Sequence, residues 1–372
     1  MALDAWLTLL HAAQATPRPW LEILKARGSP EAVIGTCAAT LAGAGVGDDA
    51  IARLKTPDRA LLERWRAWLA QPARSLVTFG GEHYPPQLTN IPDAPLALWA
   101  EGAKLELLGA PQLAMVGSRN PTAGGRDIAE QFAKYLSERG LTITSGLATG
   151  IDGASHRGAV GSLGGTVAVL GGGIDSIFPR VHTELAREIA SRGLLVSEYA
   201  PGIEPRPFHF PQRNRIIAGL SLGTLVVEAT RRSGSLITAK LATEYGREVF
   251  AIPGSIHNPL ARGCHKLIRQ GAKLVEEAAD IFVELAPQLA SVIVGTIERA
   301  DDADEDSSTQ IADPEYKRVL QLVDFAPTSL VTLMERAGLT AAELSSMLLV
   351  LELEGFVEAL PGGRYSRLAK RE

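Results

Sequence analysis

The 372-residue sequence contains few cysteines, few aromatic residues and no excess of positive charge. Its two cysteines, Cys37 and Cys264, lie too far apart in the sequence to form a metal-binding or redox motif, and this usage predicts a reduced, cytoplasmic setting. No apolar run reaches about 18 residues, so no membrane span is expected. The N-terminus carries Asp4 and no basic segment, so it does not resemble a secretory signal peptide.

The charge of the chain is unevenly distributed. The formal net charge of −5 argues against a protein that binds nucleic acid over most of its surface. Residues 204–273 nevertheless contain 11 Lys and Arg against 4 Asp and Glu, a net charge of +7, whereas residues 276–315 contain 1 Arg against 12 acidic residues, a net charge of −11. A binding site for a polyanion is therefore expected to be local and to lie in the first of these segments.

Residues 112–286 are expected to form an α/β domain with a parallel sheet. Short apolar runs predict strands at 113–116, 142–144, 167–170, 194–196, 224–227, 249–251 and 273–275. Amphipathic runs predict helices near 125–139, 153–161, 181–192, 212–220, 235–246 and 262–270. This alternation is typical of a parallel sheet with helices on both faces, and ligands of such sheets bind beyond the carboxyl ends of the strands.

The segments before this domain have a different character. Residues 1–75 predict a small helical domain of the SAM or helix-hairpin-helix type, because apolar residues recur at helical spacing and glycine turns separate the helices. Such turns occur in DNA-binding proteins, although packing against the neighbouring domain is the favoured explanation here. Residues 76–111 are rich in proline and predict an extended connection and the start of the core.

The segments after the α/β domain are predicted to be a linker and a small third domain. Residues 287–313 include a run of acidic residues and predict an acidic, flexible linker. Residues 314–372 combine three helical stretches with a turn at 361–363, which predicts a winged-helix domain. Its many glutamates repel phosphate, so its composition fits a protein-interaction or regulatory role at least as well as DNA binding.

Residue types that bind phosphate gather at the predicted strand ends. Glycines and short hydroxyl side chains let backbone amides approach an anion, and guanidinium groups add paired donors. The candidate polyanion-binding residues are Gly117, Ser118, Arg119, Arg213, Asn214, Arg215, Ser233, Gly234, Ser235, Thr238 and Lys240. The glycine spacing after the first strand does not match the dinucleotide fingerprint, so no cofactor is predicted.

Two other groups of polar residues have simpler, structural interpretations. Asp152 and His156 stand one turn apart on a predicted helix, but no third ligand or nucleophile follows at a matching spacing. A helix N-cap and a helix histidine are therefore favoured over catalysis or metal binding. Glu228 ends a strand, and a role in holding Arg213, Arg215 or a nearby loop is favoured over a catalytic one.

Eight short motifs follow one another through residues 112–284. They are GSR at 117–119, SGLATGID at 145–152, LGGGID at 170–175, SEY at 197–199, FPQRNRIIAGLS at 210–221, VVEA at 226–229, SGSLITA at 233–239 and IPG at 252–254. This ordered set resembles the DNA-processing protein A family, DprA, also called Smf. The flanking helical and winged-helix segments fit the longer members of that family.

The resemblance implies a protein whose Rossmann-like domain, at residues 112–286, binds single-stranded DNA, forms a homodimer and hands the strand to RecA. In natural transformation such a protein protects incoming DNA and helps RecA to displace single-strand-binding protein. The resemblance implies no catalytic activity, no cofactor and no metal.

The resemblance also implies roles for individual residues. Arg119, Arg213 and Arg215 would contact phosphates, with the serines of 233–235 and Lys240 around the same pocket. The aromatic residues best placed to stack on bases are Phe178, Phe208 and Phe210. One departure from the family pattern is the pair Cys264 and His265, where the family tends to have a small polar residue and asparagine, so the role of that turn is left open.

Two other classes of function stay open at this point. A nucleotide-binding enzyme similar to the lysine-decarboxylase-like phosphoribohydrolases would account for Gly223, Thr224 and Glu228, but not for the arginines around Asn214 or the SGSLITA turn. A pure interaction module would act through residues 314–372. The single-stranded-DNA-binding mediator is the favoured interpretation.

Overall fold

The computed structural model describes residues 2–14, 16–301, 314–323, 328–339, 341–353, 356–360 and 364–367. The chain divides into two compact units, residues 1–288 and residues 289–372. No helix within these described ranges is long and apolar enough to cross a bilayer.

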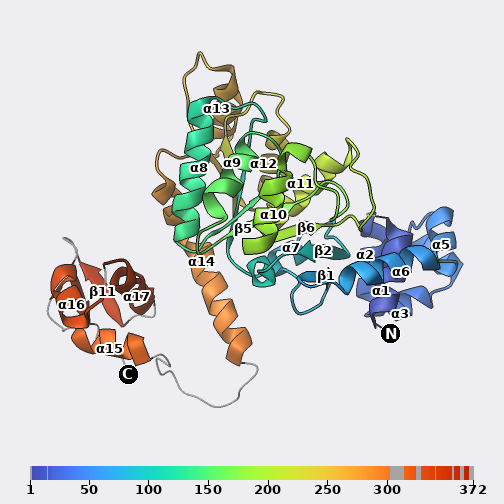
Figure 1. The fold of residues 1–372 in the computed structure, drawn as a ribbon, viewed down its shortest axis with the longest axis horizontal. Helices are drawn as coiled ribbons and strands as arrows, with labels where there is room; N and C mark the ends of the chain where they lie inside the picture. Colours follow the sequence, from blue (N-terminus) through green and yellow to red (C-terminus); the bar gives the residue numbers. More distant parts are fainter. Residues whose placement is uncertain are drawn as a thin grey trace. The chain divides into compact units, whose positions relative to one another are not determined.

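The first unit is built on a nine-stranded sheet with the order β1-β2-β6-β5-β4-β3-β7-β8-β9 (Figure 1). Strands β3 to β9 run parallel to one another, whereas β2 pairs antiparallel with both β1 and β6. The predicted α/β fold with a mostly parallel sheet is confirmed. The strands are β1 (Arg74–Thr78), β2 (Ala97–Glu101), β3 (Gln112–Gly117), β4 (Thr142–Ser145), β5 (Thr166–Val169), β6 (Leu194–Ser197), β7 (Gly223–Val227), β8 (Glu248–Ala251) and β9 (Lys273–Leu274).

The helices between these strands cover the two faces of the sheet. From β3 the chain moves one way through β4 and β5 to β6, then returns to the other side of β3 for β7, β8 and β9. Because parallel crossovers are right-handed, the helices of the first run lie on one face and those of the second run on the other. The first run holds α8 (Ala123–Glu138), α9 (Ile151–Ala159) and α10 (Thr183–Arg192), and the second holds α11 (His209–Leu220), α12 (Ser235–Glu244) and α13 (Arg262–Arg269).

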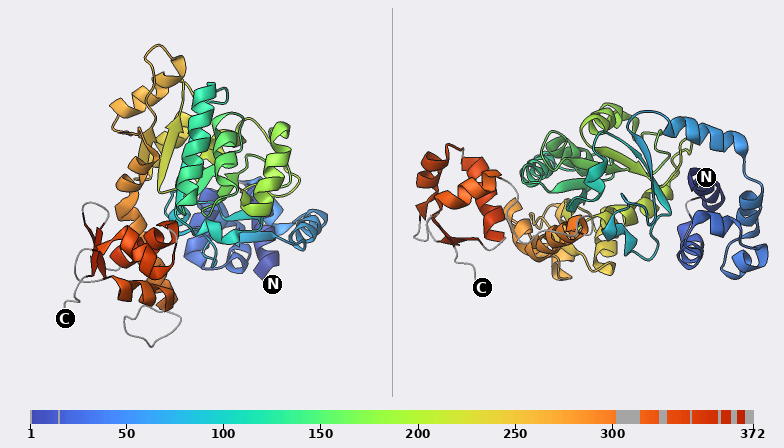
Figure 2. Two further views of the ribbon diagram at one scale, coloured as in Figure 1. Left: turned by 60° about the vertical axis from the view of Figure 1, so that its left-hand side comes forward. Right: turned by 90° about the horizontal axis from the view of Figure 1, so that it is seen from below.

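Residues 2–69 are helical, as the periodicity predicted, and they form one compact unit with the sheet. Figures 1 and 2 show these helices beyond the β1–β2 edge of the sheet. Trp65 and Trp68 both meet Trp99 of β2 edge to face, with ring centroids 5.4 and 5.7 Å apart. The helices are α1 (Ala2–Ala13), α2 (Pro17–Arg27), α3 (Pro30–Ile34), α4 (Ala38–Gly43), α5 (Asp48–Lys55) and α6 (Arg59–Leu69).

The interpretation of residues 76–111 as an extended connection was incomplete. Most of β1 and all of β2 lie in or at the edge of this segment and extend the sheet by two antiparallel strands. Residues 94 and 96–100 are all buried, so the segment is part of the core. Its prolines lie between β1 and β2, except Pro111 just before β3, and α7 (Pro86–Thr89) begins at one of them.

Beyond the end of α14, the described residues of the second unit form three helices and a small antiparallel sheet of order β10-β12-β11, as predicted for a winged helix. The predicted turn at 361–363 lies outside the described residues. The elements are α15 (Pro314–Leu322), β10 (Thr328–Ser329), α16 (Leu330–Ala337), α17 (Ala341–Leu353), β11 (Val357–Leu360) and β12 (Arg364–Arg367).

The predicted flexible linker over 287–313 was wrong for its first part. Helix α14 spans Ala278–Asp301 and continues past Pro287. The segment 289–297 is apolar and supports a helix, whereas the acidic residues that motivated the prediction begin at Asp301. Residues 302–313 lie outside the described residues.

We predict that Gly158→Ala destabilises the first unit by about 2 kcal/mol because it overpacks the contact between two helices. A Cβ at Gly158 of α9 would meet the backbone carbonyl of Glu130 in α8, which cannot move aside as a flexible side chain can. Urea unfolding followed by circular dichroism measures the change.

The matched control for this substitution is Gly124→Ala in the first turn of α8. The nearest atom to a Cβ at Gly124 is the Thr122 hydroxyl at 4.0 Å, so alanine fits there. It should leave stability unchanged or raise it by less than about 1 kcal/mol. Equal effects of the two substitutions would contradict the packing argument.

Candidate nucleic-acid interface

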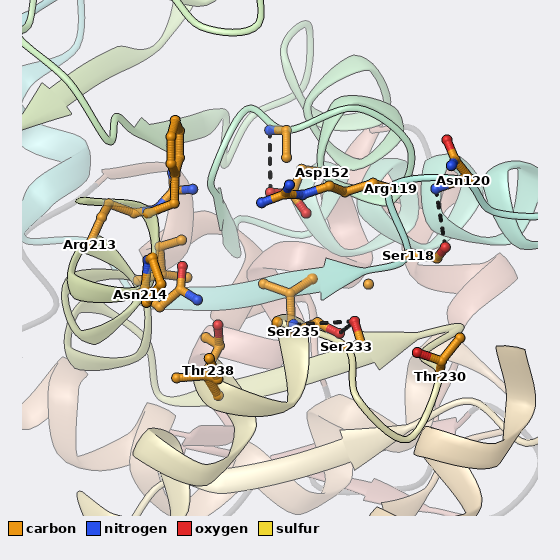
Figure 3. Close-up of a pocket in the computed structure, with 18 of the residues that line it drawn as sticks. Ser118, Arg119, Asn120, Asp152, Arg213, Asn214, Thr230, Ser233, Ser235 and Thr238 are labelled. Atoms are coloured by element: carbon orange, nitrogen blue, oxygen red, sulfur yellow. Dashed lines mark hydrogen bonds between the residues drawn. The ribbon is translucent and has the colours of Figure 1, made fainter. Parts of the chain in front are cut away.

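A cavity of about 500 Å³ opens beyond the carboxyl ends of β3 and β7 (Figure 3). These two strands are neighbours at the point where the strand order reverses. The loops that leave them turn to opposite faces of the sheet, so a crevice forms between the loops. The cavity therefore lies where a parallel sheet of this order is expected to bind a ligand.

Nine of the eleven predicted site residues line this cavity: Gly117, Ser118, Arg119, Arg213, Asn214, Ser233, Gly234, Ser235 and Thr238. The prediction did not include Asn120 and Thr230, which also line it. Both follow a strand end by three residues, so a wider window after each strand would have found them. Asp152, which was assigned a structural role, lines the cavity as well.

The loop after β3 presents Arg119 to the cavity. Arg119 is exposed and makes no ion pair within the described part of the chain. Figure 3 shows its side chain running toward Asp152. The loop backbone is fixed, because the Asn120 amide donates to the Ser118 hydroxyl at 3.1 Å and the Ile151 amide donates to the Ser118 carbonyl at 3.1 Å. The Arg119 guanidinium is therefore accessible to a ligand, while the backbone of its loop is held in place.

Glu228 at the end of β7 holds this same loop in place. Its carboxylate accepts hydrogen bonds from the Thr122 amide at 2.8 Å and the Thr122 hydroxyl at 2.7 Å, and from the Asn258 amide group at 3.4 Å. Glu228 adopts a φ of 53°, a left-handed conformation that is unusual for a residue other than glycine. The predicted role in holding a nearby loop is confirmed, although the partners are not the arginines.

Arg213 on α11 forms the inner wall of the cavity. It is only 5% exposed, and its Nη1 donates to the carbonyl oxygens of Gly146 and Val169. A Cβ at position 146 would lie 2.5 Å from the guanidinium, so glycine is required there. Burial lowers the pKa of Arg213 to about 10, an effect that the Asp152 carboxylate opposes, and the group stays charged at neutral pH.

The start of α12 forms the opposite wall. The Ser233 and Ser235 hydroxyls lie 2.7 Å apart, and the Ser235 amide donates to Ser233 Oγ at 3.3 Å. The first amides of a helix lack intrahelical partners and carry partial positive charge, so this end attracts an anion. Thr238, one turn further, is buried beneath these residues.

Arg215 does not lie in the cavity, and its burial is at odds with the predicted phosphate contact. Its side chain is 8% exposed and pairs with Glu198 at 2.6 Å and Asp93 at 3.1 Å. Positions two residues apart point about 200° apart around a helix, so Arg213 and Arg215 leave α11 in nearly opposite directions. Lys240 also lies outside the cavity lining, where it is exposed and pairs with Glu244 at 3.2 Å.

The histidine on α9 is structural, as favoured from the sequence. His156 is fully buried, its Nε2 accepts from the Leu147 amide at 3.3 Å, and its Nδ1 lies 2.8 Å from the Thr166 hydroxyl. Since that hydroxyl donates to the Ile143 carbonyl, Nδ1 must carry the proton and the ring is neutral. Asp152 accepts from the amides of Gly146 and Ala148 at 3.2 and 3.4 Å, and burial raises its pKa.

Cys264 and His265 lie in helix α13 and not in a turn, and Cys264 contributes to packing. Cys264 is fully buried with its thiol 3.6 Å from the Val226 carbonyl, and burial raises its pKa to about 11, so it is not a reactive thiolate. His265 Nε2 lies 3.0 Å from the Gly254 carbonyl. Within the described ranges, no group of three His, Cys, Asp or Glu residues is placed to hold a metal ion.

Comparison with known proteins identifies the family. The model of the family described as DNA recombination-mediator protein A matches residues 75–286, more than half of the chain. The chain belongs to this family. A second model, the DprA winged helix domain, matches residues 303–363 and agrees with the fold of the second unit.

Relatives and solved structures agree with the family assignment. Protein Smf of Escherichia coli (strain K12) is 44% identical over 318 residues, which cover 84% of this chain and 82% of the relative. The X-ray structure of DNA processing protein A from Streptococcus pneumoniae matches with a TM-score of 0.66 at 39% identity, over 74% of this chain and 95% of that one. A structure of DNA processing protein A from Helicobacter pylori, described for its single-stranded DNA binding mode, matches with a TM-score of 0.52 at 28% identity, over 58% of this chain and 96% of that one.

We predict that Arg215→Ala lowers the free energy of unfolding by about 4 kcal/mol, because it leaves the buried Glu198 carboxylate without its cation. Arg119→Ala removes an exposed side chain and should change stability by less than about 0.5 kcal/mol. Urea unfolding of both variants checks this contrast. A destabilised Arg119→Ala variant, or an Arg215→Ala variant as stable as the wild type, would contradict these assignments.

We also predict that His156 makes the fold less stable as the pH falls. Burial lowers its pKa to about 3, whereas in the unfolded chain it titrates near the ordinary value of 6.5. Between these values only the unfolded state binds the proton, so stability is lost as the pH drops below 6.5, by about 1.4 kcal/mol per pH unit. Urea unfolding at pH 7 and pH 5 of the wild type and of His156→Gln measures the difference.

The control for this pH experiment is His83→Gln, which alters an exposed histidine. The His156→Gln variant should show a weaker dependence of stability on pH than the wild type, whereas His83→Gln should keep the wild-type dependence. The same slope in all three proteins would show that His156 titrates normally in the folded state.

Proposed function

We propose that the chain is a single-stranded-DNA-binding recombination mediator that protects incoming DNA and loads RecA during natural transformation, without catalysis of its own. The observation that carries the proposal is the gathering of Arg119, Arg213 and the start of α12 around one open cavity at the strand-order reversal. Family membership and the described DNA-binding mode of the Helicobacter pylori relative support it.

The cavity offers three kinds of phosphate donor. Arg119 supplies an exposed guanidinium, α12 supplies helix-start amides, and Ser233 and Ser235 supply hydroxyls. Arg231 and Arg232 are exposed on the loop between β7 and α12 and extend the positive charge beyond the rim. Asp152 offsets part of this charge, but burial raises its pKa and its oxygens already accept amide hydrogen bonds.

Aromatic side chains beside the cavity suit unpaired bases. Phe210 lines the cavity, and Phe178 packs on it with ring centroids 5.4 Å apart while remaining 52% exposed. Bases stack on exposed aromatic rings without regard to their identity, whereas a duplex keeps its bases inside. The site therefore favours single-stranded over double-stranded DNA and tolerates different sequences.

RecA loading, a homodimeric state and contact with single-strand-binding protein are proposed from the family assignment. The second unit, with its winged helix, is proposed to serve a protein-interaction or regulatory role. We propose that the protein has no catalytic activity because the two side chains best suited to catalysis, Glu228 and His156, are both engaged in structural hydrogen bonds. Glu228 is engaged by Thr122 and Asn258, and His156 is neutral, buried and bonded on both ring nitrogens.

We predict that the wild type binds single-stranded oligonucleotides more tightly than duplexes, with an affinity that falls as salt rises. Arg119→Ala should weaken single-strand binding about tenfold and reduce the salt slope by about 0.7, the loss of one phosphate contact. Fluorescence anisotropy of labelled oligonucleotides across a salt series measures both. Arg119 is preferred to Arg213 for this test because Arg213 also bonds the main chain of the fold.

The control is Arg187→Ala, which removes an exposed arginine on α10 away from the cavity lining. It should bind as the wild type does. Equal affinity for single and double strands, or no effect of Arg119→Ala, would argue against the proposal. Hydrolysis of a nucleoside monophosphate that is lost in Glu228→Gln would instead favour the phosphoribohydrolase alternative.

A further inference from the structure

A second cavity, of about 330 Å³, lies between the N-terminal helices and the β2–β6 side of the sheet. Residues of α1 and α6 form one wall, and β2 with the segment from Glu198 to His209 forms the other. The cavity belongs entirely to the first compact unit. The phosphate-binding site described above does not include it.

Aromatic rings form part of the walls of this second cavity, and Phe208 is the exposed one among them. Trp65 and Trp99 meet edge to face at 5.4 Å, and His209 stacks on Tyr199 with ring centroids 4.1 Å apart. The Trp65 indole donates to the Pro201 carbonyl at 3.2 Å, which fixes its ring against the opposite wall. Such flat, rigid surfaces suit a planar ring.

The rim of the second cavity carries an exposed aromatic ring, Phe208, and an exposed cation, Arg206. Phe208 is 53% exposed and meets His209 edge to face at 4.5 Å. Arg206 is exposed and makes no ion pair in the part of the chain that the structure describes. The carboxylate in the lining, Glu198, is neutralised by Arg215 at 2.6 Å, so it does not oppose a phosphate at the rim.

The start of α11 contributes residues to both cavities. Phe208 and His209 line the second cavity, and the next two residues, Phe210 and Pro211, line the first. Phe208 and Phe210 are two residues apart, so their Cα atoms are at most about 7 Å apart. An extended DNA strand can span that distance. A strand that leaves the first cavity across this turn reaches the rim of the second.

We propose that the second cavity takes an unpaired base of the same single strand whose phosphates bind in the first cavity. Phe208 and the aromatic walls would hold the base, and Arg206 would contact the neighbouring phosphate. This inference rests on the proposed function. It adds a base-binding subsite that the N-terminal helices complete, and it gives those helices a part in DNA binding.

The tryptophans make the proposal testable, because Trp65 and Trp99 line the second cavity and no tryptophan lines the first. Titration of the full chain with unlabelled oligo-dT should quench tryptophan emission, and Trp65→Phe should lose much of that quenching. Phe208→Ala and Arg206→Ala should reduce the quenching and weaken binding, by about tenfold for Phe208→Ala. Anisotropy of a labelled oligo-dT reports binding independently of the tryptophans.

The matched controls are Phe178→Ala for Phe208→Ala and Arg187→Ala for Arg206→Ala, since neither control residue lines the second cavity. Both should keep full quenching at saturation, even if Phe178→Ala weakens binding beside the first cavity. Binding by anisotropy with unchanged tryptophan emission, and wild-type affinity of Phe208→Ala and Arg206→Ala, would overturn the inference and leave the proposed function standing. Absence of oligo-dT binding by anisotropy would overturn both.

Discussion

The reversal of strand order at β3 is the constraint on which the site depends. Because β4 lies on one side of β3 and β7 on the other, the loops after β3 and β7 separate and leave a crevice between them. Glu228, at the start of the loop after β7, bonds to Thr122 in the loop after β3 and so joins the two loops. Its left-handed backbone conformation costs conformational energy, and its hydrogen bonds to Thr122 and Asn258 offset that cost. The crevice is thus open to a ligand and rigid at its base.

A second constraint is the close packing beneath the crevice. Arg213 can enter the interior because Gly146 has no side chain and because two main-chain carbonyls accept its protons. His156 is held by a chain of hydrogen bonds from Leu147 through Thr166 to Ile143. Apart from Arg213 Nε, which has no hydrogen-bond partner among the described residues, these groups bond to the backbone and to Thr166, and these bonds fix the strand ends.

The sequence predicted the parallel sheet, and nine of the eleven residues predicted for the site line the candidate cavity, for a clear physical reason. Buried parallel strands are short, apolar runs, and their ends are marked by glycine and hydroxyl residues, so the position of each loop could be assigned from the chain alone. Arg215 could not be assigned in this way, since its direction depends on the rotation of α11 and its partners Glu198 and Asp93 are distant in sequence. Strands β1 and β2 were not predicted because the prolines between them indicated an extended connection. The linker prediction failed over the residues where an apolar segment continues α14.

The two arginines of the crevice differ in their freedom to move. Arg213 is held by main-chain oxygens, so under the proposed function its charge would act on a DNA strand from a fixed position and would influence how fast the strand binds. Arg119 is exposed and makes no ion pair within the described residues, so under the proposed function it would contact the anion directly and would influence how slowly the anion dissociates. Under the proposed function, the crevice would therefore use one arginine to attract the DNA strand and another to retain it. Such a protein would hold a strand firmly and still release it when a competitor replaced the contacts of the loop after β3.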